Sequence, residues 1–547
     1  MDEADTSAGK GLGRRGFIGA VAALTGTALT AGPAAATSAD AAAPTAAATA
    51  DQSLPPNAVS LVPISKGAVT AAVARLDKVI RDLIQRTGVP GVATAVVHDG
   101  KVVFSRAYGV RDVTTKAPVT VDTVFQLASV SKPLAATAVA RGVHLKKVQW
   151  TDTIASHLPG FTLQDPYVGS HVTIEDMLAH RSGLPHAAGD LLEDLGYPRD
   201  VILERLRLEP LTPMRTLYNY SNFGYTSGGA AAARAAGMSW EDFADAMLFR
   251  PLGMATASYR YADFVSRPNR SAMHVRVDGV WQQRYTRDAD PEAPAGGGSA
   301  SVVDLAKWMM LQLAEGAWNG SPFIDPDVLR VMRTPAIVLS PPKPAIGRSS
   351  FSGQGLDISD DAAARVRWSH SGAFFQGAAT QVILLPSAGL GIVTLTNGMP
   401  VGLPEAIGAS FLDLVEASTV QRDWLAGYGG LFAASMANTS KLAGKTPPAN
   451  PTPAQPNAFY VGTYDNAFYG SIQVVDQVGT LRLLIGPHPN DYPLTHWDGN
   501  EFAFYPTGEN AAGITAADFT PNAGGTHAAR VVLEYYDNDG LGTFTLH

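Results

Sequence analysis

The chain has no cysteine among its 547 residues, and this absence excludes several kinds of chemistry. Without thiols there can be no disulfide, cysteine nucleophile, iron–sulfur cluster or thiolate-bound zinc. Any nucleophile must therefore be an oxygen or an amine. Charged residues are only 16% of the chain, and the formal net charge of -8 is not gathered into a basic stripe or an acidic block. This distribution argues against a nucleic-acid partner and against a polybasic membrane contact.

Long hydrophobic runs are also scarce. The apolar stretch near the N-terminus, Phe17 to Leu29, is diluted by Gly and Thr and is shorter than the roughly 20 residues that span a membrane. An Arg-Arg pair precedes it and an A-x-A site follows it, whereas a membrane anchor would need a longer run. The pattern predicts a twin-arginine signal peptide of a secreted bacterial protein, with no membrane span after cleavage.

The length exceeds that at which a single core stops growing, so at least two domains are expected. An Ala-, Thr- and Ser-rich stretch follows the signal, and a Pro-rich segment without an apolar face interrupts the chain near residue 450. We therefore expect a signal peptide at residues 1–36, a disordered spacer at 37–65, a main domain at 66–418, a helix and linker at 419–458, and a small β-barrel-like accessory domain at 459–547.

The order of elements predicts an α+β fold. Apolar residues recur at helical spacing from Val69 to Leu83, and Gly88 is placed to end that helix. Asp99-Gly100 then joins two β-rich runs, which is a strong hairpin signal. Strand character returns late in the main domain, after a mostly helical stretch. We expect an antiparallel sheet built from both ends of the domain, flanked by helices and carrying a helical lobe.

The most informative motif is Ser129-Val130-Ser131-Lys132. If a helix begins near Ser129, the hydroxyl and the ammonium group share one face. A buried lysine with a lowered pKa can take the proton of a serine nucleophile. Taken alone, the spacing is weak, because a surface serine near a solvated lysine would look the same.

Two later motifs add groups of the right chemistry. Tyr220 and Asn222 lie in LYNYSNFGY, where a tyrosine can relay a proton and an asparagine can hold a substrate amide or the lysine. His370 and Gly372 lie in H-S-G just before the late strands, where glycine lets substrate approach a strand edge. Taken alone, each of these two motifs would more often have a structural role.

Together and in this order, the three motifs resemble the serine β-lactamase and penicillin-binding-protein superfamily, in particular its class C β-lactamase-like branch. The resemblance covers roughly residues 66 to 418 and includes HVTIEDMLAHRSGLP, PLGM, PAGGGSASVVDLAKW and LTN. It implies a β-lactamase/transpeptidase-like fold with the site between the helical lobe and the sheet. The domain after the linker resembles, more weakly, a small β-barrel appendage of some relatives.

The resemblance also implies roles for individual residues. Ser129 would be the nucleophile, with Lys132 and Tyr220 sharing its proton, and the sequence leaves open which of the two is the general base. The substrate-binding residues would be Asn222, His370 and Gly372. The backbone amides of Ser129 and Ala373 would form the oxyanion hole. No cofactor and no metal are implied.

His370 departs from the family pattern, because it stands where the K-T-G lysine is expected. A mostly neutral side chain there puts broad β-lactamase activity in doubt. The H-x-G form looks more like that of esterases, D-amino-acid peptidases and amidases, and some DD-carboxypeptidases of this branch. We expect a secreted hydrolase of a small ester, amide or peptide, with a DD-carboxypeptidase or β-lactamase as the alternative. Residues 186–212 and 337–366, which look least like the family, should rim the cleft and set specificity.

Two non-catalytic functions remain: a silent binding protein, and an adhesin whose C-terminal domain is the functional part. The accessory domain could cap the cleft or contact carbohydrate or cell wall. Its aromatic residues could form a stacking surface, although their spacing is more typical of a core; they are Tyr460, Tyr464, Phe468 and Tyr469.

Overall fold

The computed structural model describes residues 62–342 and 347–547. The expected signal peptide and nearly all of the expected spacer lie outside the described residues. Within the two described ranges, none of the helices is long and apolar enough to cross a membrane.

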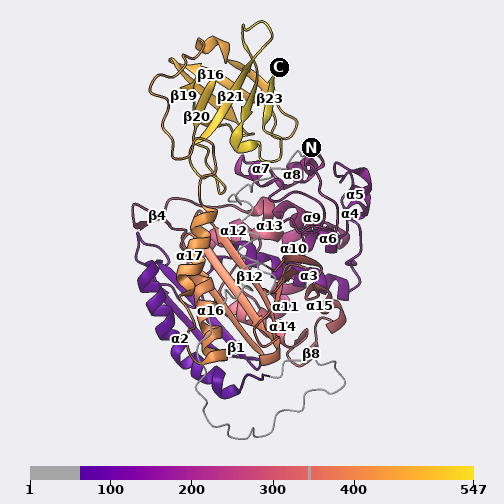
Figure 1. Ribbon diagram of the computed structural model, residues 1–547. Coiled ribbons are helices and arrows are strands. Elements are labelled where there is room, and N and C mark those ends of the chain that lie inside the picture. Colours follow the sequence, from indigo (N-terminus) through magenta and orange to yellow (C-terminus); the bar gives the residue numbers. More distant parts are fainter. Residues whose placement is uncertain (1–61, 343–346) are drawn as a thin grey trace, which may run out of the picture.

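An eight-stranded antiparallel sheet forms the centre of the main domain (Figure 1). Its order is β2-β1-β14-β13-β12-β11-β10-β9, so the N-terminal hairpin pairs with the last strand of the domain. Asp99 and Gly100 have φ of 48° and 71°, as a tight hairpin turn requires. The strands are β1 (Gly91–His98), β2 (Lys101–Gly109), β9 (Ile337–Ser340), β10 (Ser350–Ser352), β11 (Asp357–Asp360), β12 (Val366–Phe374), β13 (Ala378–Leu385) and β14 (Leu390–Thr396).

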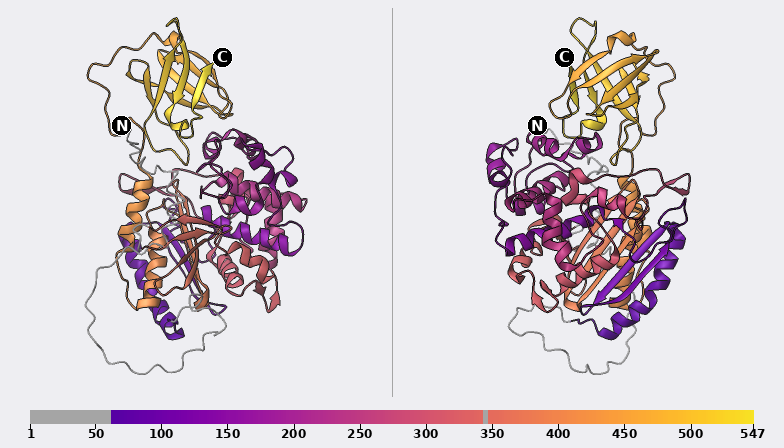
Figure 2. Two further views of the ribbon diagram at one scale, coloured as in Figure 1. Left: turned by 45° about the vertical axis from the view of Figure 1, so that its right-hand side comes forward. Right: turned by 180° about the vertical axis from the view of Figure 1, so that it is seen from behind.

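Helices from the two ends of the main domain, and the helix that follows it, cover one face of this sheet (Figure 2). They are α2 (Lys66–Thr87), α16 (Leu403–Ala417) and α17 (Trp424–Ser435). The apolar face of α2, including Leu76 and Ile80, packs with Phe411 of α16 in a single buried cluster. Gly88 has a φ of 66° and its N–H donates to the Ile84 carbonyl oxygen, so α2 ends at the predicted residue.

The helical lobe packs on the other face of the sheet (Figure 2). Its longest helices are α3 (Ser131–His144), α9 (Asn222–Ala235) and α14 (Val302–Leu313). The shorter helices are α4 (Ile154–His157), α5 (Pro166–His171), α6 (Ile174–Leu178), α7 (Asp190–Asp194), α8 (Arg199–Arg205), α10 (Trp240–Ala244), α11 (Arg250–Leu252), α12 (Tyr261–Ser266), α13 (Ala293–Gly296) and α15 (Pro326–Met332). The main domain also has three two-stranded ribbons: β3 (Phe125–Gln126) with β6 (Ser299–Ala300), β4 (Val275–Val277) with β5 (Val280–Gln282), and β7 (Ala317–Trp318) with β8 (Ser321–Pro322). The expected α+β arrangement is confirmed.

The C-terminal residues form a separate nine-stranded antiparallel sheet that curls into a nearly closed barrel (Figure 1). Its strands are β15 (Gly462–Asp465), β16 (Ile472–Gln477), β17 (Thr480–Ile485), β18 (Asn490–Pro493), β19 (Thr495–Asp498), β20 (Glu501–Phe504), β21 (Thr515–Pro521), β22 (Ala528–Leu533) and β23 (Thr543–Leu546). All four aromatic residues considered for a stacking surface are buried, namely Tyr460, Tyr464, Phe468 and Tyr469. They belong to the core of this domain.

Candidate active site

Ser129 and Lys132 lie at the start of α3, where a sharp turn brings the chain out of β3. Ala128, directly before the serine, has a φ of 47°, a left-handed conformation that costs a residue with a side chain about 1 kcal/mol. Residues Ala128–Val130 form a single 3₁₀ turn that continues into α3. Lys132 Nζ is 3.2 Å from Ser129 Oγ. The predicted pairing of the two side chains is present.

Tyr220 and Asn222 reach the same point from the start of α9. Ser221 caps this helix by accepting the Gly224 N–H, which fixes the residues on either side of it. Tyr220 Oη is 2.6 Å from Ser129 Oγ. Lys132 Nζ donates to Asn222 Oδ1 at 2.8 Å and to the Ala295 carbonyl oxygen at 3.0 Å. The nucleophile candidate therefore touches both groups that were predicted to share its proton.

Burial controls the protonation of this group. Lys132 is 0% exposed, and this desolvation lowers its pKa to about 7 against the opposing field of nearby carboxylates. Burial raises the pKa of Tyr220 well above its ordinary value, while its hydrogen bond with Ser129 acts in the opposite direction. At neutral pH the tyrosine is thus a phenol, and Lys132 is close to its titration midpoint.

Strand β12 brings His370, Gly372 and Ala373 to the other side of Ser129. A Cβ on Gly372 would lie 2.4 Å from the Leu127 carbonyl oxygen and 2.9 Å from the Ser129 backbone nitrogen, so the strand can approach only with glycine there. The pairing of β11 with β12 ends at Ser369. Residues 370–374 therefore lie on an edge of β12 that β11 does not pair with.

His370 is held as a neutral side chain. Burial, helped by the charge of Lys132, lowers its pKa to about 3. Its Nδ1 donates to the Ser371 carbonyl oxygen at 2.7 Å, which leaves Nε2 as a hydrogen-bond acceptor. The side chain in the position of the family's K-T-G lysine therefore carries no positive charge at neutral pH.

Two further residues support the site and were not singled out from the sequence. The His180 ring stacks on Tyr220 with 4.5 Å between centroids, and its Nδ1 accepts the Ser221 N–H at 3.2 Å. Asp190 accepts from Asn222 Nδ2 at 3.3 Å. His180 lies within a segment that carries the family resemblance, and Asp190 lies within residues 186–212, but no local pattern indicates either contact.

A buried charge cluster lies beside the site. Arg287 Nη2 donates to Glu193 Oε2 at 2.7 Å and to Glu292 Oε1 at 2.8 Å. The Arg287 guanidinium also lies over the Phe374 ring of β12, 4.7 Å from its centroid. Glu292 in turn contributes to the field at Lys132. The cluster ties the helical lobe to the sheet at the edge of the site.

Arg287→Met should destabilise the protein by about 3 kcal/mol, because it leaves two buried carboxylates without their cation. The free energy of unfolding can be measured by urea denaturation. Arg284→Met is a matched control, since Arg284 is exposed and, among the described residues, its side chain donates a hydrogen bond to Gln282 alone. Equal stability of the two variants would show that the cluster contributes nothing.

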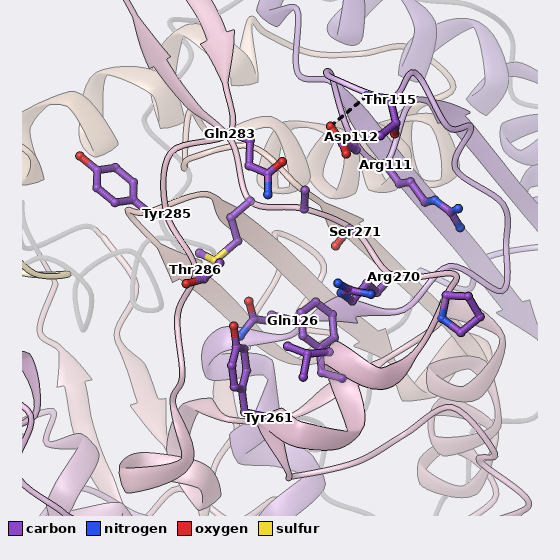
Figure 3. Close-up of a pocket in the computed structure, with 15 residues that line it drawn as sticks. Arg111, Asp112, Thr115, Gln126, Tyr261, Arg270, Ser271, Gln283, Tyr285 and Thr286 are labelled. Carbon is purple, nitrogen blue, oxygen red and sulfur yellow. Dashed lines mark hydrogen bonds between the residues drawn. The ribbon is translucent and has the colours of Figure 1, made fainter.

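A separate surface cavity of about 260 Å³ lies between α12 and the segment that follows β4 and β5 (Figure 3). Its walls include Arg111, Gln126, Tyr261, Arg270 and Tyr285, and none of the predicted site residues. This cavity is therefore distinct from the group around Ser129. In the described parts of the chain, no cluster of three or more His, Asp or Glu side chains is arranged to hold a metal ion.

Comparison with known proteins supports the fold and the family. The family model described as Beta-lactamase matches residues 76–415, and a domain of unknown function, DUF3471, matches residues 446–538. An octameric penicillin-binding protein homologue from Pyrococcus abyssi has the same fold, with a TM-score of 0.55 at 19% identity over 84% of this chain and 98% of its own. The expected β-lactamase/transpeptidase-like fold is thereby confirmed.

Three curated relatives match part of the chain. Unguisins hydrolase ungD' of Aspergillus campestris is 25% identical over 58% of this chain and 60% of its own length. Esterase EstB of Burkholderia gladioli is 32% identical over 45% and 64%, and Penicillin-binding protein 4 of Amycolatopsis lactamdurans is 35% identical over 30% and 44%. The matches thus span less than two thirds of each relative. Because the family model covers most of the chain, the protein belongs to the beta-lactamase family of serine hydrolases.

Proposed function

We propose that the protein hydrolyses a small ester or amide through an acyl-enzyme on Ser129. The observation that carries this proposal is the contact of Ser129 Oγ with Tyr220 Oη at 2.6 Å and with Lys132 Nζ at 3.2 Å. A serine hydroxyl needs a neighbouring proton acceptor to become a nucleophile. Lys132, with a pKa of about 7, supplies one at neutral pH.

The chemistry follows from these contacts. Ser129 Oγ bonds to the substrate carbonyl carbon as its proton passes to Lys132, directly or through the Tyr220 hydroxyl. The bond to the leaving group then breaks, and the leaving group takes a proton from the same pair. In deacylation, water attacks the acyl carbon and gives a proton to Lys132 or Tyr220. The bond from the acyl carbon to Ser129 Oγ then breaks, and Ser129 takes a proton back from the same pair. The backbone N–H groups of Ser129 and Ala373 would stabilise both oxyanions.

The neutral state of His370 supports a preference for uncharged substrates. A cation in its place would grip a substrate carboxylate, whereas the His370 side chain offers a hydrogen-bond acceptor instead. The 32% identical relative named an esterase agrees with this preference. The 35% identical relative named a penicillin-binding protein favours a second candidate, a DD-carboxypeptidase or β-lactamase, through the same acyl transfer.

The test is to incubate the protein with a fluorophosphonate or a penicillin and measure its intact mass. Turnover is then followed on p-nitrophenyl esters, D-amino-acid p-nitroanilides, D-Ala-D-Ala peptides and nitrocefin. A single adduct on Ser129 with ester or amide turnover is expected. Turnover of nitrocefin or D-Ala-D-Ala alone would favour the second candidate, and neither adduct nor turnover would favour a binding protein.

The rate should depend on pH through Lys132. Because its pKa is lowered to about 7, the amine is protonated and inactive below that pH and free to accept a proton above it. We expect kcat/KM for an uncharged ester to rise tenfold per pH unit below about 7 and to level off above it.

The contribution of another buried group with a raised pKa, Glu405, must be separated from that of Lys132. Burial raises the pKa of Glu405, on α16 behind β12, to about 7 as well. The rising limb should therefore persist in Glu405→Gln if Lys132 causes it. A limb that disappears in this variant, or one centred near pH 4, would contradict the assignment to Lys132.

The remaining expectations are proposals of the same kind. The protein would be exported by the twin-arginine route and act outside the cytoplasm on a small-molecule or peptide substrate. Contact of the accessory domain with carbohydrate or cell wall has less support, because its four candidate aromatic residues are buried.

A further inference from the structure

The accessory domain is docked onto the main domain through its β20–β21 loop, residues 505–514, and through neighbouring contacts (Figure 1). Tyr197 Oη donates to the Tyr469 carbonyl oxygen, and Arg205 Nη1 donates to that of Phe468, both at 2.7 Å. Glu509, in the middle of the loop, is only 5% exposed. A glutamate so deeply buried at an interface between domains needs specific partners.

The loop is bonded first to the helical lobe. The Asp194 carboxylate, at the end of α7, accepts the backbone N–H of Glu509 at 2.9 Å and that of Asn510 at 3.1 Å. It also accepts from Asn510 Nδ2 at 3.0 Å. Gly508 has a φ of 128°, and a Cβ there would lie 2.5 Å from Asp194 Cγ. The loop therefore fits closely against α7.

The same loop is bonded to the sheet. The Glu509 carboxylate accepts the backbone N–H of Phe375 through Oε1 and that of Gln376 through Oε2, the latter at 3.2 Å. Both residues belong to the turn that joins β12 to β13. Ala373, whose N–H is assigned to the oxyanion hole, lies two residues before Phe375. One loop of the accessory domain thus bridges both walls of the site.

We propose that the 505–514 loop is the end wall of the substrate cleft and limits the length of the substrate on one side of the scissile bond. A substrate that lies extended along residues 370–374 of β12 would run toward the β12–β13 turn, against which Glu509 lies. Phe375 follows Ala373 by two positions, which is about 7 Å at the usual rise per residue of a strand. A longer group on that side would collide with the loop.

This proposal rests on the proposed function and narrows its substrate class. The enzyme would act on small esters or amides, or on the terminal unit of a peptide, and would exclude the interior of a long chain. The accessory domain would be a specificity element of the hydrolase, with Glu509 as the residue that positions the β12–β13 turn.

The test uses the full chain and two loop variants. Glu509→Ala removes the bonds to the turn, and Gly508→Ala forces the loop away from Asp194. Asp491→Asn is the control, because it removes an ion pair with Arg482 on the barrel surface. Thermal unfolding verifies folding, and either loop variant is sufficient if the other does not fold.

Two series of substrates test whether the loop limits substrate length. One series is lengthened in the acyl group (p-nitrophenyl acetate, butyrate and octanoate) and the other in the leaving alcohol. The octanoyl chain exceeds 7 Å and the acetyl group does not. In the loop variants, the ratio of kcat/KM for long over short substrates should rise about tenfold or more in one series. In Asp491→Asn it should equal that of the unmodified protein.

Labelling of Ser129 by methyl and octyl fluorophosphonates, followed by intact mass, gives a second readout that needs no turnover. The labelling rate for octyl over methyl should rise in the loop variants in the same way. If Ser129 is labelled but the octyl over methyl rate ratio and both substrate series are unchanged in both variants, the proposal that the loop limits substrate length is wrong and the proposed function stands. Absence of any Ser129 adduct in the unmodified protein would overturn the proposed function, and the wall with it.

Discussion

Replacing Ser129 by alanine is expected to lower kcat/KM by about 10⁴-fold or more on any substrate that the protein turns over. The reason is that no other hydroxyl is held against both Tyr220 and Lys132 at hydrogen-bond distance in the described structure. The loss of one hydroxyl should leave the melting temperature within a few degrees of the original value. Steady-state kinetics and differential scanning calorimetry measure the two effects.

Ser131→Ala is the matched control for this variant. Ser131 lies two residues further along, and its hydroxyl accepts the Gly298 N–H on the structural side of the turn. We expect Ser131→Ala to lower the melting temperature but to change kcat/KM little. Turnover that survives in Ser129→Ala, together with a fluorophosphonate adduct on another residue, would refute the assignment of the nucleophile.

Lys132→Met and Tyr220→Phe should each lower kcat by about 10³-fold, because each removes one member of the pair that carries the serine proton. The double variant should lose little more than the worse single variant, since groups that act as a unit are not additive. Single-turnover acylation rates on an activated ester measure this directly.

Tyr218→Phe separates the chemical role of the Tyr220 hydroxyl from the effect of removing a tyrosine hydroxyl beside His180. Tyr218 lies beside His180, as Tyr220 does, but has no hydrogen bond to Ser129 in the structure. Its activity should remain within a few-fold of the original. A Tyr220→Phe variant that behaves like Tyr218→Phe would remove the tyrosine from the proton path and leave Lys132 to act alone.

The parts of the site that could be predicted from the sequence are contacts between residues that lie close together along the chain. The i, i+3 spacing of Ser129 and Lys132 becomes a contact once a helix forms, whatever the rest of the chain does. The same holds for the hairpin at Asp99-Gly100 and the helix end at Gly88, where a positive φ is required. The resemblance to the family then added Tyr220 and His370, which no local rule connects to Ser129.

Contacts between distant segments could not be predicted in this way. Asp190 and Asn222 meet only because α7 and the start of α9 pack together, and Glu509 meets Phe375 across 134 residues of chain. No periodicity records such contacts, because each partner taken alone looks like an ordinary polar residue. For the accessory domain the sequence could not decide between a cap over the cleft and a binding surface, because the same aromatic residues can fill a core or form a stacking surface.

The route of the chain through the central sheet has a kinetic consequence. Strand β1 pairs with β14, so that Thr94 and Thr394, 300 residues apart, are joined by a hydrogen bond of 3.1 Å. Closing so long a loop is entropically costly, and folds dominated by such distant pairings form slowly. Ser129 and His370 both lie between Thr94 and Thr394 in the sequence, so the loop that this pairing closes contains both residues. Slow closure of that loop would delay the assembly of the site.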